Sequence, residues 1–160
     1  ALPKLERLTF AGSTAGDEAL EAVSRVRQLK SFSTWHTMQT QAGNAHLAKL
    51  PGLAALKIGQ RLPRWGTAPP PSFDETTIPT LAGMKSLERL ELFEAVLTAR
   101  GLAPLEGLPN LKVLAIHTTE IPAADVAAVR AALPGVAVEY RPLTADERDG
   151  TLRKKLRLIP

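Results

Sequence analysis

The chain has 160 residues, of which 44% are hydrophobic, 4% are aromatic and none is cysteine, and its formal net charge is +4. This length can bury a sizeable core, and the scarcity of aromatic residues predicts that the core is aliphatic. The missing cysteines exclude disulfides and cysteine-ligated metals within the segment. A stretch of about 20 apolar residues, as a membrane-spanning helix needs, is not present. We therefore expect a single soluble domain.

A short phrase with leucine at its first position recurs at intervals of 24 residues, starting at residues 5, 29, 53, 87 and 111. One interval is stretched to 34 residues. The clearest copy reads Leu87-Glu88-Arg89-Leu90-Glu91-Leu92, and a degenerate further copy occupies 136–138. Polar and apolar residues alternate within the phrase, which predicts a half-buried strand. We expect strands centred near Leu8, Phe32, Leu56, Leu90 and Leu114.

A helical pattern follows each phrase and ends at a breaker such as Pro109, which comes after Leu102, Leu105 and Leu108. Proline stops a helix and returns the chain to the next strand. A strand–turn–helix unit cannot bury its apolar face alone, so the units must stack. The period and the pattern L-x-x-L-x-L are typical of leucine-rich repeats. We predict an α/β fold, a right-handed leucine-rich repeat solenoid of about five to six repeats with a parallel concave β-sheet and convex helices.

The segment from Leu111 to Val126, with Ile121-Pro122-Ala123-Ala124-Asp125, resembles the repeats of bacterial leucine-rich repeat proteins of the type abundant in planctomycetes and verrucomicrobia. The resemblance covers residues 1–140, and 133–140 resembles the last strand of such arrays. It implies the solenoid fold and is compatible with a periplasmic or secreted location. Because such repeats are attached to many unrelated modules, it implies little about function.

Residues 141–160 are expected to form a C-terminal capping helix or tail. Thr144 and Glu147 have the spacing of a capping box, and Leu152 and Leu156 would share one face that covers the last repeat. The basic residues of this segment alternate with acidic ones. The net charge is therefore better explained by a solvated helix than by a nucleic-acid-binding surface.

The N-terminus begins inside a repeat, since Leu2-Pro3-Lys4-Leu5 matches Leu108-Pro109-Asn110-Leu111. Solenoids need a polar cap at each end. We therefore expect the chain to be a piece of a longer polypeptide or a processed product. An uncapped first repeat also favours self-association through its open strand edge.

The repeat register aligns the outward strand positions in columns across the sheet. From β-strand to β-strand these are Arg7, Ser31, Ala55, Arg89 and Val113; Thr9, Ser33, Lys57, Glu91 and Ala115; Ala11, Trp35, Gly59, Phe93 and His117; and Gly12, His36, Gln60, Glu94 and Thr118. Strands lie about 4.8 Å apart, so Trp35 and Phe93 are expected about 10 Å apart with Gly59 between them. Two rings flanking a glycine would form a slot for a partner. The alternative is that the rings pack against the stretched repeat and hold it down.

The stretched repeat contains an insertion at residues 60–74, in which proline and glycine are frequent. Such a sequence cannot form regular helix or sheet, and Pro69-Pro70-Pro71 favours local polyproline II structure. Trp65 and Phe73 supply apolar area to pack, so we expect an ordered loop at the rim of the concave face. Its candidate binding residues are Arg61, Arg64 and Trp65.

Catalytic chemistry has little support in this sequence. Glu91, Glu94 and His117 could form an acid–base group, but no nucleophile motif, phosphate loop or metal spacing accompanies them. His36 and His117 are predicted too far apart to share a metal. We expect neither a catalytic site nor a cofactor.

Two functions remain open. One is a non-catalytic module that binds a protein or peptide on its concave face. The other is a structural or scaffold region of a larger, exported bacterial enzyme or assembly. For the binding module the candidate residues are Trp35, His36, Lys57, Gln60, Arg89, Glu91, Phe93 and His117.

Overall fold

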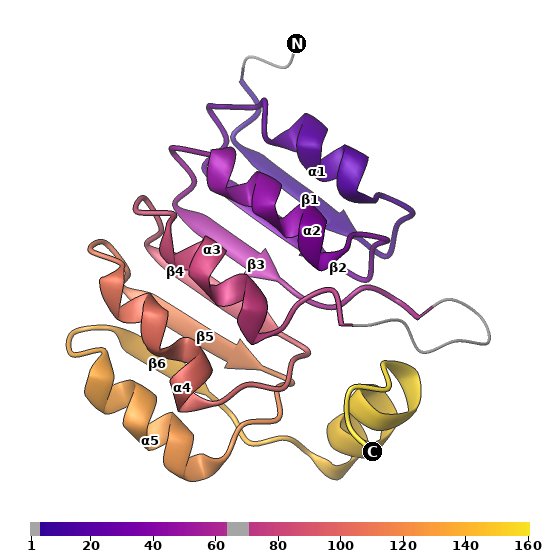
Figure 1. Cartoon of the computed structure of the whole chain (residues 1–160), viewed down its shortest axis with the longest axis vertical. Helices are drawn as coiled ribbons and strands as arrows, with labels where there is room; N and C mark the ends of the chain where they lie inside the picture. Colours follow the sequence, from indigo (N-terminus) through magenta and orange to yellow (C-terminus); the bar gives the residue numbers. More distant parts are fainter. Residues whose placement is uncertain (1–3, 64–70) are drawn as a thin grey trace.

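In the computed structural model, which describes residues 4–63 and 71–160, six strands form one sheet. They follow each other in sequence order, and every neighbouring pair is parallel (Figure 1). The strands are β1 (Arg7–Ala11), β2 (Ser31–Trp35), β3 (Ala55–Ile58), β4 (Arg89–Phe93), β5 (Val113–His117) and β6 (Ala137–Tyr140). The predicted parallel sheet is therefore confirmed, and the degenerate sixth copy of the phrase forms β6.

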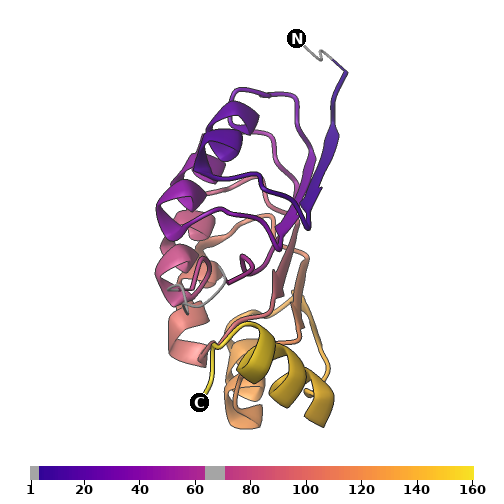
Figure 2. The ribbon, with the colours of Figure 1, turned by 90° about the vertical axis from the view of Figure 1, so that its right-hand side faces the viewer.

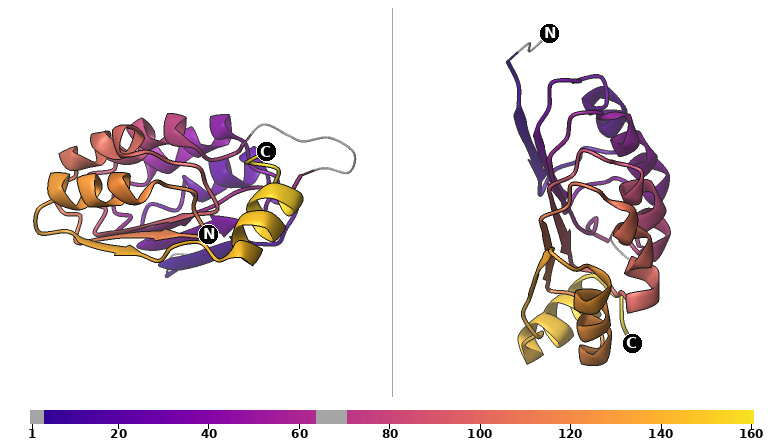
Figure 3. Two further views of the ribbon diagram at one scale, coloured as in Figure 1. Left: turned by 90° about the horizontal axis from the view of Figure 1, so that it is seen from below. Right: turned by 90° about the vertical axis from the view of Figure 1, so that its left-hand side faces the viewer.

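Short helices return the chain from each strand to the next and cover one face of the sheet (Figures 2 and 3). They are α1 (Asp17–Val23), α2 (Gln41–Asn44) with η1 (Ala45–Lys49), η2 (Glu75–Thr77) with α3 (Ile78–Ala82), α4 (Ala99–Leu102) with η3 (Ala103–Gly107), and α5 (Ala123–Ala132). In three coils a turn of α-helix adjoins a 3₁₀ turn. The opposite face of the sheet is the concave face.

The core lies between the sheet and this helical layer. The inward strand residues Leu56, Leu90 and Leu114 are at most 2% exposed, as the alternation predicted. In β2 the inward positions are Phe32 and Thr34, and Thr34 is also fully buried and donates a hydrogen bond of 2.5 Å to Gln39 Oε1. A polar side chain is tolerated there because it has a buried partner. Phe10 of the edge strand β1 is only partly buried.

Carboxylates of one coil cap the helix of the next. Both oxygens of Asp17 in α1 accept hydrogen bonds from Thr40, the N-cap of α2, at 2.7 Å from its backbone NH and 2.6 Å from its hydroxyl. Glu75 accepts the same pair of bonds from Thr98, the N-cap of α4. In each case the helix has a glycine three residues after the cap, Gly43 or Gly101, and a Cβ there would overlap the carboxylate. The repeats are thus joined on the helical side as well as through the sheet.

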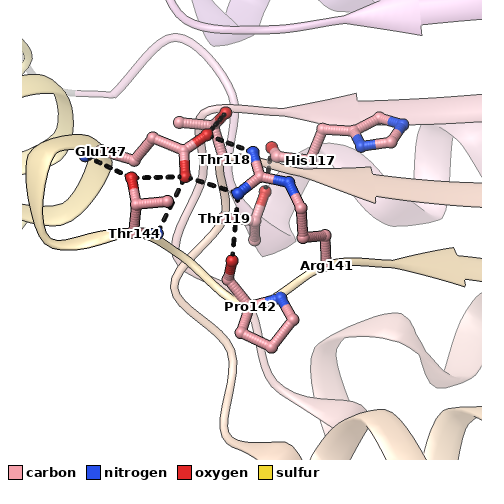
Figure 4. Close-up of polar contacts among 7 residues, drawn as sticks. All are labelled: His117, Thr118, Thr119, Arg141, Pro142, Thr144 and Glu147. Atoms are coloured by element: carbon pink, nitrogen blue, oxygen red, sulfur yellow. Dashed lines mark hydrogen bonds and ion pairs between the residues drawn. The ribbon is translucent and has the colours of Figure 1, made fainter.

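The C-terminal segment forms the π-helix η4 (Asp146–Lys155). The predicted capping box is present: the backbone NH of Thr144 donates to Glu147 Oε2 at 2.8 Å, and the backbone NH of Glu147 donates to Thr144 Oγ1 at 3.2 Å (Figure 4). Leu152 and Leu156 are buried. The helix lies beside the carboxyl end of β5, however, and not across the outer edge of β6 (Figure 1). The division of the chain at residue 140 stays a prediction.

Three polar contacts hold η4 in this position. Arg148 forms an ion pair of 3.0 Å with Glu120, which follows β5. Arg141 pairs with Glu147, which also accepts a hydrogen bond of 3.3 Å from Thr118 (Figure 4). Three basic residues of this segment, Arg141, Arg148 and Arg153, are thus paired with carboxylates. In the part of the chain that the structure describes, no helix has the length and apolar character needed to cross a membrane.

Candidate functional site

The concave face carries the first two predicted columns in the expected register. Arg7, Ser31, Ala55 and Arg89 face one another on successive strands, and Thr9, Ser33, Lys57 and Glu91 form the next row. β5 and β6 extend this second row with Ala115 and Glu139. Side chains of one row therefore come from rigid, hydrogen-bonded neighbours, and their spacing is fixed by the sheet.

The rings of Trp35 and Phe93 meet, and the predicted slot between them is wrong. Their centroids are 6.5 Å apart and their planes are inclined by 80°, an edge-to-face contact. A Cβ on Gly59 would lie 3.0 Å from both Trp35 Cβ and Phe93 Cδ1, so the glycine lets the two side chains lean together over it. Aromatic pairs favour this geometry, which buries apolar area that a slot would leave in water. The result is one half-buried aromatic platform.

Lys57 lies over this platform. Its Nζ is 4.8 Å from the Trp35 ring centroid, 4.4 Å from that of Phe93 and 2.6 Å from Glu91 Oε1. Two ring faces and a carboxylate thus surround one ammonium group, the arrangement in which cation–π attraction and charge pairing act together. The cluster of Trp35, Lys57, Glu91 and Phe93 joins three strands and has a defined shape.

A second ion pair crosses the sheet further along. Arg89 on β4 reaches Glu139 on β6 at 2.9 Å, and the hydrogen bond holds the pKa of Glu139 below its usual value. Because the partners flank β5, their side chains cross its outward surface, and Ala115 is fully buried although it points outward. Both partners are more than 40% exposed, so solvent screens the pair.

The fourth predicted column does not lie on the concave surface. Gly12, His36, Glu94 and Thr118 have left-handed backbone conformations, with φ between 47° and 58°. This turn ends β1, β2, β4 and β5 and directs the chain toward the helical layer. Glu94 in this turn is only 2% exposed, and so is Gln60, which follows β3 without a left-handed backbone. In this column only Gly12 indicates a left-handed backbone from the sequence, since glycine adopts that conformation without strain.

Gln60 is a structural residue, contrary to the prediction that it belongs to the binding surface. Its amide nitrogen donates to the carbonyl of Phe73, and its Oε1 accepts from the backbone NH of Ser72 at 3.0 Å. The backbone NH of Arg61 adds a third hydrogen bond to this group, which it donates to Ser72 Oγ at 2.8 Å. These bonds tie the two ends of the insertion together. Arg64, Trp65 and the expected loop at the rim lie outside the described residues.

The buried carboxylate of Glu94 pairs with His36, a contact that the sequence did not predict. His36 Nε2 lies 2.7 Å from Glu94 Oε2, with 18% and 3% of the two side chains exposed. The grouping of Glu91, Glu94 and His117 considered above is not formed, because both glutamates have other partners. No cluster of three or more potential metal ligands occurs within the described parts of the chain.

Solved structures resemble this architecture. A leucine-rich repeat protein of Leptospira interrogans matches 75% of the chain with a TM-score of 0.51 and 20% sequence identity. The chain has the leucine-rich repeat fold. Internalin C2 of Listeria monocytogenes matches 82% of the chain with a TM-score of 0.48 and 19% identity. The chain spans 27% of the Leptospira protein and 51% of the internalin. No protein-family model and no curated protein matches it.

Proposed function

We propose that this chain is a non-catalytic interaction module that binds a protein or peptide on its concave face. The binding surface would consist of Trp35, Lys57, Arg89, Glu91, Phe93 and His117. Gln60 is left out because its side chain is buried, and His36 because it lies in the turn that ends β2 and pairs with Glu94. The observation that carries the proposal is the aromatic platform under Lys57, which is half-buried and faces outward from rigid strands.

The composition of this surface suits a protein partner. Aromatic residues and arginine are enriched where protein interfaces bind most strongly, and charges of both signs give the surface its specificity. The platform supplies the aromatic residues, and the Lys57–Glu91 and Arg89–Glu139 pairs supply charges of both signs.

The proposal can be tested before the partner is identified. A displayed library of random peptides is selected on the folded chain, and the affinity of the best binder is measured by calorimetry. Trp35→Ala and Phe93→Ala should each weaken binding by about 1–4 kcal/mol. Arg130→Ala, an exposed change on the helical side, is the control and should have little effect.

Loss of binding in the Arg130 variant, with retention in both aromatic variants, would contradict the proposal. A library that yields no specific binder would instead favour the scaffold alternative. The closer kinship with planctomycete and verrucomicrobial repeats stays a prediction that rests on the motif in residues 111–126. A location outside the cytoplasm rests on the same resemblance.

A further inference from the structure

A depression of about 130 Å³ opens on the concave face beside the aromatic platform. Its lining includes Ser31 and Ser33 of β2, Ala55 and Lys57 of β3, and Arg89 and Glu91 of β4. The strand register places these residues on three neighbouring strands, so the depression is part of the sheet itself.

Some of the polar groups around the depression have hydrogen-bond or ion-pair partners, and others do not. The hydroxyls of Ser31 and Ser33 have no hydrogen-bond partner among the residues that the structure describes. Arg7 faces Ser31 from β1, is exposed and likewise lacks an ion pair within the described ranges. Lys57 and Arg89 are paired with Glu91 and Glu139. Two free hydroxyls therefore line the depression, and one unpaired cation lies beside it on the neighbouring strand.

We propose that the partner presents an acidic peptide segment, and that its carboxylates bind to Ser31 and Ser33 in this depression and to Arg7 beside it. This inference rests on the proposed binding function of the concave face and names the chemistry of its partner. An ionised carboxylate accepts several hydrogen bonds at once, and hydroxyl and guanidinium donors are the groups that satisfy it. A neighbouring carboxylate of the same segment can share Arg89, whose pair with Glu139 is open to solvent.

The arrangement favours a peptide carboxylate over the phosphates of a nucleic acid. Single strands bind through exposed aromatic faces together with a basic groove. Here Lys57 already occupies the faces of Trp35 and Phe93. Glu91 and Glu139 also border the basic side chains and would repel a continuous row of phosphates. Separate carboxylates along a peptide can avoid both acids and still reach Arg7.

The test titrates the labelled chain with short peptides of glutamate, glutamine or lysine and follows backbone amide signals by NMR. The glutamate peptide should shift the signals of Ser31, Ser33 and Ala55 and should bind most tightly. Arg7→Glu should weaken it by about fivefold or more, whereas Arg100→Glu, the same charge change on an exposed helical residue, should weaken it by less than about twofold. A Ser31→Ala, Ser33→Ala variant, which keeps the charge, should also bind less tightly.

Other results would overturn the inference. Equal losses in the Arg7 and Arg100 variants would show attraction to net charge only. Tighter binding of the lysine or glutamine peptide to the same strands would refute the acidic partner while leaving the concave face as the binding surface. If a short single-stranded oligothymidylate binds more tightly than the glutamate peptide, and this binding depends on Arg7, the depression is a phosphate site. If no probe shifts these signals, the depression is not a carboxylate site, and the concave face is then judged by the library selection alone.

Discussion

Replacement of Gly43 by alanine tests whether carboxylates join neighbouring coils. In an ordinary helix this change is stabilising by about 1 kcal/mol, because alanine loses less backbone freedom on folding. Here the new Cβ would lie 2.5 Å from Asp17 Cγ, so the carboxylate must leave its place. It would give up its bonds to the backbone NH and the hydroxyl of Thr40. Hydrogen bonds to charged groups are worth about 1.5–3 kcal/mol each, and part of this returns when water solvates the displaced group.

We therefore expect Gly43→Ala to lower the free energy of unfolding by about 1–3 kcal/mol, measured by urea denaturation. The sharper test is the double variant. In an Asp17→Ala background the overlap with the carboxylate is removed and only the Cβ of residue 17, at 3.1 Å, stays close, so Gly43→Ala should cost at least about 1 kcal/mol less than in the native background. A destabilisation of the same size in both backgrounds would refute the role of Asp17 and point to some other cause.

Three further outcomes follow from the packing and the charges. Leu90→Ala should cost about 2–5 kcal/mol of stability in urea denaturation, because the side chain is fully buried between sheet and helices. His36→Ala should cost about 3 kcal/mol in the same assay, since it leaves the Glu94 carboxylate buried without its partner. The pKa of Glu147 is lowered to about 2, and the hydrogen bond from Arg141 is the largest cause. The contacts of Glu147 therefore contribute fully to stability above the ordinary pKa of a glutamate, and this contribution is lost as the pH falls toward 2. NMR signals in and around η4 should therefore change over that acid range, and Glu147→Gln should remove the part of this change shown by Thr118 and Thr144, which donate hydrogen bonds to Glu147.

Each of these outcomes has a control. Val113→Ala shortens a half-buried outward side chain of β5, so it should cost much less than Leu90→Ala, and equal costs would mean that the strand register is wrong. Adding Glu94→Gln to His36→Ala should restore part of the stability, and a further loss would contradict the explanation. If the signals of η4 stay constant on acidification, Glu147 does not hold the helix to the turn after β5.

The repeat period was sufficient to predict the sheet. The apolar positions of the recurring phrase fixed which strand residues face the core, and the register of Arg7, Ser31, Ala55 and Arg89 followed from the interval between copies, including the stretched one. This success has a simple physical basis, because a shift of one residue would turn every leucine of a strand toward water. The capping box at Thr144 was equally local and was also predicted correctly.

The candidate site was harder to predict because its shape depends on side chains of different coils. Strand spacing gave the separation of the Trp35 and Phe93 backbones but not the rotamers that bring their rings together over Gly59. The burial of Gln60 depends on Ser72 and Phe73, at the other end of the insertion. Periodicity within one repeat carries no information about such contacts.

Glu94 was predicted to face outward, and it is buried for a related reason. Alternation predicts an outward side chain only while the strand continues, and here the chain turns left-handed at this residue. Its partner His36 comes from the end of β2, two coils away, so no local pattern could pair them. The carboxylate that caps α2 from α1 was missed for the same reason.

The structure of a complex with a selected peptide would show whether a partner binds on the concave sheet. NMR contacts between the peptide and the chain would locate the bound segment. We predict contacts to Trp35, Lys57 and Phe93, with the peptide lying across β2 to β4. Contacts confined to the helical side, for example to the groove between α4 and α5 lined by Leu102 and Val129, would contradict the proposal.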